Sequence, residues 1–183
     1  QSRPLPWGSR PAGFAANSDR FDIKWVMNDS RSNGISKIRN QLPVENLREG
    51  AALYYAGLHA KLAPVFGPPA TALEVLPYIL VRTRCLTAFD GEHLVGILGI
   101  HDARGGFLEA DYRTMARHYG ALMGMTRLML LMLLDHQLPP GDLYLDGIVV
   151  AEAHRGQGVG TALIAAFEGL ARENRFKTVS LEV

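Results

Sequence analysis

The sequence predicts a single α+β domain. Apolar residues recur at helical spacing over residues 45–65, which indicates an amphipathic helix packed against a core. Asp90-Gly91 separates two apolar segments, and this dipeptide supplies the positive φ that a tight β-hairpin turn needs. Residues 143–150 are apolar at most positions, as expected of a strand that is covered on both faces. A chain of 183 residues is long enough for one domain with its own core.

The first part of the chain predicts an arm that precedes the domain. Residues 1–20 are rich in Pro, Gly, Ser and Ala, which favour a loop. Residues 21–27 begin with alternating apolar and polar residues, which predicts a strand, and a turn-forming linker follows. Residues 35–42 predict a second strand. The sequence therefore divides into an arm of residues 1–34 and a domain of residues 35–183.

The remaining elements follow from apolar spacing and from proline and glycine. Gly67-Pro68-Pro69 ends the first helix, and Pro139-Pro140-Gly141 ends a long helical region before the buried strand. Leu73 and Ile164 are among the apolar residues that we expect to face inward. In chain order, the predicted elements are a helix at 45–65, a helix at 71–84, a hairpin at 85–101, a helical region at 111–136, a strand at 143–150, a helix at 158–173 and a strand at 179–183.

Composition gives no electrostatic case for binding nucleic acid or an anionic membrane. The chain carries 19 basic and 18 acidic residues, a net charge of +1. The longest apolar run, residues 128–134, is far shorter than the roughly 20 residues of a membrane-spanning helix, and the N-terminus has no signal-peptide core. The single cysteine, Cys85, permits no intrachain disulfide and fits a reducing, cytoplasmic location. Because the sequence starts with Gln1, we expect it to begin inside a longer gene product.

The most informative segment joins the buried strand to the helix that follows it. Gly156, Gly158 and Gly160 alternate at the turn, where glycine permits positive φ and lets a ligand approach the backbone. The first N–H groups of a helix have no partner within it, so the turn predicts an anion cradle suited to a pyrophosphate. A P-loop would need a lysine after Gly160, and the dinucleotide fingerprint has a different glycine spacing. A tight turn without a ligand is the structural alternative.

Arg155-Gly-Gln-Gly-Val-Gly160 resembles the acyl-CoA pyrophosphate loop of the GNAT superfamily of N-acetyltransferases, written Arg/Gln-x-x-Gly-x-Gly/Ala. With the order of elements, the resemblance covers residues 35–183. It implies a GNAT-type mixed, mostly antiparallel sheet with helices on both faces, and acetyl-CoA as the cosubstrate without a metal ion. The acyl-CoA-binding residues that it implies are Ile148, Val149 and Val150 along the strand, Arg155 in the loop, and Gly156, Gln157, Gly158, Val159, Gly160 and Thr161 at the helix start.

The acceptor amine is helped by a base, or by water that leads to one, although many members of this superfamily manage without a strong protein base. An amine with a lysine-like pKa near 10.4 is neutral in only about one molecule in a few thousand at pH 7. Asp146 is the predicted catalytic residue, because it lies four residues before Val150 with the same strand parity. A strand-edge carboxylate bound to backbone or to an arginine is the structural alternative. His101 and Glu182 are weaker candidates, and His154 is expected beside the cofactor.

The resemblance implies transfer of an acetyl group from acetyl-CoA to an amine by direct attack in a ternary complex. Cys85 lies outside the motif and suggests no acyl-enzyme. The expected acceptor is a small-molecule or peptide amine. A non-catalytic acyl-CoA-binding or regulatory domain is the alternative. A third hypothesis is an interaction module that uses the helix at 119–134, which could be a core or covering helix, an acceptor-site wall or the face of a homodimer.

The sequence departs from the family at its end. GNAT proteins normally continue after the fifth strand with a helix, which often carries the tyrosine that protonates the departing thiolate, and with two more strands. Nothing follows Val183, and no tyrosine occurs in residues 1–53 or after Tyr144. One hypothesis is that residues 10–29 supply the closing hairpin, in cis or from another protomer. The other is that residues 1–30 are a tail and that the sequence lacks the closing elements.

Overall fold

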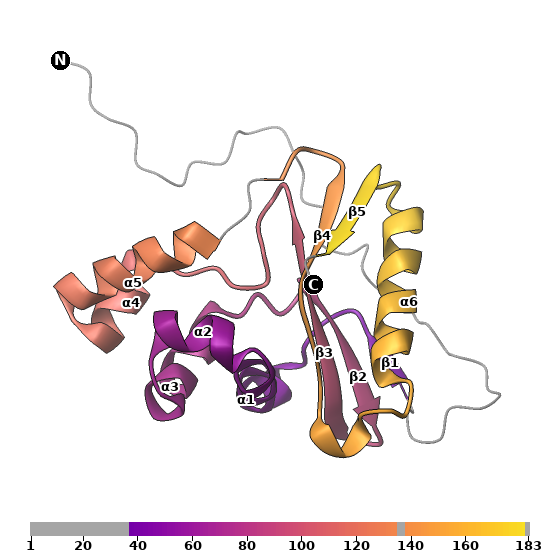
Figure 1. The fold of residues 1–183 in the computed structure, drawn as a ribbon, viewed down its shortest axis with the longest axis horizontal. Coiled ribbons are helices and arrows are strands. Elements are labelled where there is room, and N and C mark those ends of the chain that lie inside the picture. The colour runs from indigo at the N-terminus through magenta and orange to yellow at the C-terminus, as the bar shows by residue number, and fades with distance from the viewer. Residues whose placement is uncertain (1–36, 135–137, 182–183) are drawn as a thin grey trace.

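The computed structural model describes residues 37–134 and 138–181 (Figure 1). Within these residues, one sheet is formed by five strands in the order β1 (Lys37–Arg39), β2 (Cys85–Asp90), β3 (His93–Asp102), β4 (Asp142–Val150) and β5 (Thr178–Leu181). Neighbouring strands are antiparallel except β4 and β5, which are parallel. The predicted α+β fold with a mixed, mostly antiparallel sheet is confirmed.

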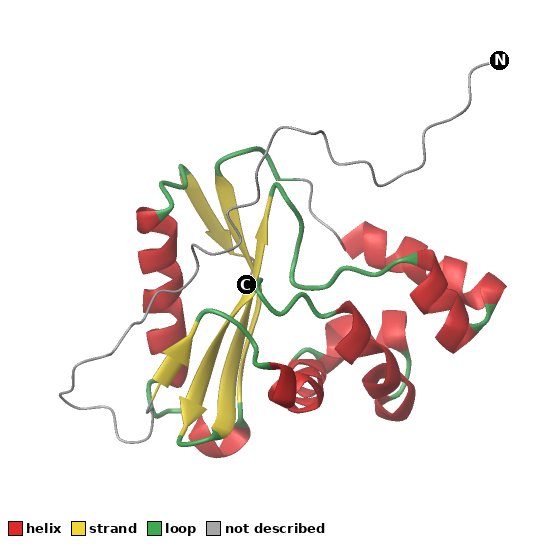
Figure 2. Cartoon of the chain, turned by 180° about the vertical axis from the view of Figure 1, so that it is seen from behind, coloured by secondary structure: helices red, strands yellow, loops and turns green. Residues whose placement is uncertain are grey.

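Helices cover both faces of the sheet, as Figures 1 and 2 show from opposite sides. On one side lie α1 (Leu47–Gly57), α2 (His59–Phe66), α3 (Pro69–Ile79), α4 (Tyr112–Tyr119) and α5 (Ala121–Leu134), and on the other lies α6 (Val159–Glu173). Two 3-10 turns, η1 (Val44–Asn46) and η2 (Glu152–His154), precede α1 and follow β4. The predicted covering of both faces is confirmed.

Each face of the sheet has its own apolar cluster. On the α6 side, Val159, Leu163 and Phe167 recur four residues apart and pack against buried leucines of β2, β3 and β4. The cluster on the other side includes Tyr54, Phe66, Leu76, Phe89, Phe107 and Met115. Leu73 and Ile164 are 37% and 36% exposed, so the prediction that they face inward is wrong. Both lie beside the buried stripe of their helix.

Two predicted helical stretches are each divided into two helices. The stretch at 45–65 breaks at Leu58, between α1 and α2, and the stretch at 111–136 breaks at Gly120, between α4 and α5. Gly120 has φ of +78°, which a right-handed helix cannot contain and which glycine adopts readily. Apolar spacing could not reveal the breaks, because the helices on both sides of each break contribute to the same core cluster.

Part of the predicted organisation lies outside the described residues: the arm of residues 1–34, the closing hairpin at 10–29 and Glu182. Among the helices in the described ranges, none combines the length and the apolar character that crossing a bilayer requires.

Candidate active site

The predicted pyrophosphate loop links the end of β4 to the start of α6. Gly156 and Gly158 have φ of +74° and +84°, in the region that favours glycine. A Cβ added at either position would meet no atom within 4 Å, so the space in front of the loop is open. The first N–H to pair within the helix is that of Ala162, which donates to the Gly158 carbonyl at 2.9 Å. The N–H groups of residues 159–161 are therefore available to a ligand.

Two side chains of the loop bind backbone carbonyls and hold its shape. Arg155 Nε donates to the Val150 carbonyl at 3.3 Å, and Gln157 Nε2 donates to the Ala153 carbonyl at 2.9 Å. Arg155 thus ties the loop back to the end of β4, while its side chain stays exposed to solvent. This arrangement suits a residue that orients the loop.

β4 has a partly open edge beside the loop. Strand β3 pairs with residues 143–150 of β4, whereas β5 pairs only with residues 142–145, and Figure 1 shows β5 beside the first part of β4. The Ala151 N–H donates to a β3 carbonyl at 2.9 Å. Because backbone groups alternate in direction along a strand, those of Ile148 and Val150 point away from β3, toward the edge that β5 does not reach. An extended ligand with amide groups could pair with this edge.

A β-bulge in β4 determines where Asp146 points. Gly99 and Ile100 of β3 pair with the residues on either side of Asp146, so Asp146 is the extra residue of the bulge. Asp146 lines a pocket on the α1 side of the sheet, while Ile148 and Val150 pack with the α6 cluster on the opposite face. The predicted parity of Asp146 with Val150 is therefore wrong. It assumed an unbroken alternation of side chains, which the bulge interrupts.

Val149 is a packing residue of the same strand. Its side chain is buried on the α1 side, and a Cβ on Gly57 of α1 would lie only 2.2 Å from Val149 Cγ1. The helix therefore crosses the strand at a distance that only glycine allows. Among the three strand residues implied to bind acyl-CoA, Val149 holds α1 against β4.

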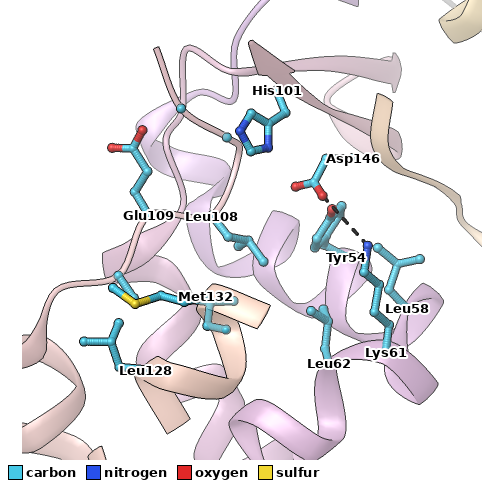
Figure 3. A pocket seen from close by; sticks show the side chains of 14 residues that line it. Tyr54, Leu58, Lys61, Leu62, His101, Leu108, Glu109, Leu128, Met132 and Asp146 are labelled. Carbon is cyan, nitrogen blue, oxygen red and sulfur yellow. Dashed lines mark ion pairs between the residues drawn. The ribbon is translucent and has the colours of Figure 1, made fainter. Parts of the chain in front are cut away.

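Asp146 lies in the wall of a pocket of about 360 Å³ between β4 and the helices α1, α2 and α5 (Figure 3). Lys61 Nζ of α2 lies 3.9 Å from Asp146 Oδ1, and their side chains are 36% and 17% exposed. Tyr54, His101 and Glu109 also line the pocket. The bulge thus brings the predicted base to a pocket whose wall also carries the ammonium group of Lys61.

Part of the Leu/Met-rich helix forms a wall of this pocket. Leu128, Leu131 and Met132 of α5 line it. That this wall faces an acceptor stays a prediction. Leu122 and Leu133 lie on α5 outside the pocket and are 84% and 80% exposed. The homodimer face at this helix stays a prediction.

Tyr54 is one of the pocket residues that sequence reasoning missed. It is 1% exposed, and its ring packs edge-to-face on Phe107 with centroids 4.9 Å apart. Burial raises the pKa of Tyr54 well above its ordinary value near 10, and the Asp146 carboxylate raises it further. The phenol therefore stays protonated at neutral pH. From sequence, Tyr54 had only the signature of a core residue at helical spacing.

The other candidate residues lie in different surroundings. His101 is 6% exposed and lines the pocket, whereas His154 Nε2 lies 3.5 Å from Asp90 Oδ2 beside the loop. Lys61 had no sequence signal beyond its place seven residues after Tyr54 in the predicted helix. In the described part of the chain, no group of three or more His, Cys, Asp or Glu side chains is placed to hold a metal ion.

Cys85 is buried and poorly suited to carry an acyl group. Its Sγ donates to the Arg82 carbonyl at 3.3 Å, and burial raises the pKa of the thiol to about 12. Because the thiolate is the reactive form, we expect no reaction of the folded protein with Ellman's reagent at about pH 8. Unfolding in guanidinium should then expose one thiol per chain. Rapid labelling of the folded protein, or hydroxylamine-sensitive acetylation of Cys85 in intact-mass spectra, would contradict this expectation.

Comparisons with known proteins bear on the family and the fold of the chain. The model of the Acetyltransferase (GNAT) family matches residues 68–183. A solved structure described as an acetyltransferase is 17% identical, with a TM-score of 0.52 over 81% of this chain and 80% of that one. An N-acetyltransferase from Staphylococcus aureus Mu50 is 15% identical, with a TM-score of 0.50 over 73% of this chain and 75% of that one.

The chain is also similar to a third solved structure. The ribosomal-protein-alanine N-acetyltransferase from Brucella melitensis biovar Abortus 2308 is 19% identical, with a TM-score of 0.46 over 80% of this chain and 79% of that one. No curated protein sequence matches the chain significantly.

Proposed function

The chain belongs to the GNAT acetyltransferase family, and from this membership we propose that it transfers an acetyl group from acetyl-CoA to an amine. The single observation that carries the proposal is a continuous binding surface. The open edge of β4 leads into a loop with two positive-φ glycines, and the loop leads into the free N–H groups of α6. A pantetheine chain followed by a pyrophosphate has the matching order of amide groups and negative charge.

Acetyl-CoA binding is proposed for the backbone of this surface. The N–H groups of residues 156–161 would hold the pyrophosphate, to which the helix terminus adds about 0.3–1 kcal/mol of attraction. The backbone groups of Ile148 and the N–H of Val150 would pair with the pantetheine amides, since the Val150 carbonyl already accepts from Arg155. Arg155 would keep the loop in place through its bond to the Val150 carbonyl. Bound acetyl-CoA supplies the acetyl group as a thioester.

Direct attack by the acceptor is the mechanism that the pocket supports best. Asp146 would hold the acceptor's ammonium group and take its proton, directly or through water. The neutral nitrogen then attacks the thioester carbonyl carbon, and the C–S bond breaks. Tyr54, which keeps its proton, is a hydrogen-bond donor in the same wall. Cys85 is buried and offers no route through an acyl-enzyme.

Binding of acetyl-CoA to the wild type is tested by thermal shift. The site of binding is then tested by calorimetry with a matched pair of glycine variants. A ligand at one hundred times its Kd stabilises the fold by about 2.7 kcal/mol. Gly158→Ala places a Cβ in the open space in front of the loop and holds alanine at a strained φ. We expect it to weaken acetyl-CoA binding by about tenfold or more, measured by isothermal titration calorimetry.

Gly91→Ala is the control for this variant. Gly91 also has positive φ, +58°, with no atom within 4 Å of an added Cβ, but it lies in the β2–β3 hairpin. It should lose a similar amount of stability and keep its affinity for acetyl-CoA. Equal affinity in the two variants would argue against the loop as the binding site. No stabilisation of the wild type by acetyl-CoA would reject the proposed function.

Release of free CoA in the presence of amines then separates an enzyme from a binding domain. The non-catalytic alternative shares the same loop and predicts stabilisation by acetyl-CoA without amine-dependent thiol release. Release above the rate of hydrolysis, with the acetylated amine identified by mass spectrometry, would support the transferase. Binding with no product from any small-molecule or peptide amine would favour the alternative.

A further inference from the structure

Lys61 and Asp146 place opposite charges side by side in one wall of the pocket (Figure 3). Their closest N and O atoms are 3.9 Å apart, at the outer limit of an ion pair, and the Lys61 side chain is 36% exposed. A pair this far apart, with its cation well exposed and its carboxylate 17% exposed, adds little to stability, because water screens it and the lysine side chain loses freedom. The same pair offers one bound molecule both a cation and an anion.

The other charges that face the pocket leave no surplus of negative charge. Glu109 lines the pocket, and its Oε1 lies 3.7 Å from Nε of Arg84. Arg84 also pairs with Asp102 at 3.0 Å, and Asp102 pairs in turn with Arg104. The carboxylates of the wall and of this network are therefore matched in number by lysine and arginine side chains. An amine with several ammonium groups would need uncompensated carboxylates to replace the water around its extra charges. A molecule with one positive and one negative group meets no such cost.

One part of the wall is apolar. Leu58 and Leu62 come from the α1–α2 segment, Leu128, Leu131 and Met132 come from α5, and Leu108 lies opposite the ion pair. About 360 Å³ is near the lower end of the range for ligand sites, roughly 300–1,000 Å³. The pocket therefore fits a small molecule with an apolar part.

From these three features we propose that the acceptor is an α-amino acid with an apolar side chain, its ammonium group at Asp146, its carboxylate at Lys61 and its side chain against α5. This inference rests on the proposed acetyl transfer and names the substrate of the same pocket. In an α-amino acid the two charged groups are separated by one carbon atom, so a single molecule can reach both members of the pair.

The step balances with these groups in place. The ammonium proton passes to Asp146 or through water to solvent, the nitrogen forms a bond to the acetyl carbon, and the C–S bond of the thioester breaks. The nitrogen loses its second proton as the amide forms, and the CoA thiolate, which leaves with the electron pair, takes up a proton, so that one proton in total goes to solvent. The product keeps its carboxylate but has lost its positive charge, so Asp146 no longer holds it and can pair again with Lys61.

The experiment compares acceptors that differ in one group, using acetyl-CoA and the purified full chain. L-leucine has the carboxylate, L-leucinamide has a neutral amide in its place, and 3-methylbutylamine lacks the group. We expect kcat/KM for leucine to exceed that for leucinamide by about tenfold or more. Leucinamide is the less basic amine, so its chemistry alone favours the opposite order. Glycine should be about tenfold or more poorer than leucine, because it does not fill the apolar wall.

Lys61→Met tests the assigned residue through the ratio of kcat/KM for the two acceptors. The chemical difference between the acceptors cancels when this ratio is compared between the wild type and the variant. The leucine-to-leucinamide ratio should fall to one or below, while Lys177→Met, which removes an exposed lysine outside the pocket, keeps the wild-type ratio. Circular dichroism checks that both variants fold. Equal use of leucine and 3-methylbutylamine, an unchanged ratio in Lys61→Met, or preference for spermidine would overturn the inference and leave acetyl transfer intact. Absence of product with every amine would instead reject the proposed function.

Discussion

Asp146→Asn is expected to lower kcat/KM for acetyl transfer to an amine by about 10²–10⁴, the range in which general bases contribute. The substitution keeps the shape of the side chain and removes the negative charge that would hold the ammonium group and take its proton. Asp146 is the extra residue of the β4 bulge and lines the pocket, whereas the loop that would bind acetyl-CoA begins beyond the end of β4. We therefore expect steady-state kinetics to show a loss of activity, and titration with acetyl-CoA to show an unchanged affinity.

Asp142→Asn is the matched control. Asp142 begins the same strand, outside the pocket, so the same chemical change there should leave kcat/KM within about twofold of the wild type. Equal activities of the two variants would mean that Asp146 is a structural carboxylate. In that case the acceptor would lose its proton to water, or His101 would be the next residue to test.

Phe107→Ala is expected to destabilise the domain by about 3–5 kcal/mol, measured by urea unfolding. Phe107 is completely buried and packs edge-to-face on Tyr54 at 4.9 Å. A Cβ on Gly99 of β3 would lie 3.1 Å from Phe107, which shows how closely the ring sits on the sheet. Its removal leaves a cavity directly behind the pocket wall. A loss of this size is a large part of the stability of an ordinary domain.

Leu122→Ala on α5 provides the comparison for this loss. Leu122 is 84% exposed, so its truncation should change the free energy of unfolding by no more than about 0.5 kcal/mol. A large effect at Leu122 would indicate that α5 packs against a second chain, in which case the midpoint should also depend on protein concentration. A small effect at Phe107 would mean that the core closes over the cavity.

Most of the fold was predictable because its signals are local in sequence. Asp90-Gly91 supplies its own turn geometry, and the β2–β3 hairpin forms around it as predicted. The buried strand β4 and the helix α6 likewise follow from runs of apolar residues at strand and helix spacing. The helix break at Leu58 was not predictable in this way, because α1 and α2 keep their apolar residues toward one core.

The glycine loop is the part of the site that the sequence by itself determined. Gly156 and Gly158 take positive φ and leave open space. Both properties follow from the absence of a side chain on the residue itself. The pocket was decided by the tertiary structure alone. Asp146 faces it because pairing with β3 leaves one extra residue in β4, and Lys61 reaches it because the chain turns at Leu58. Register and helix direction depend on partners distant in sequence, so no local pattern along the chain specifies them.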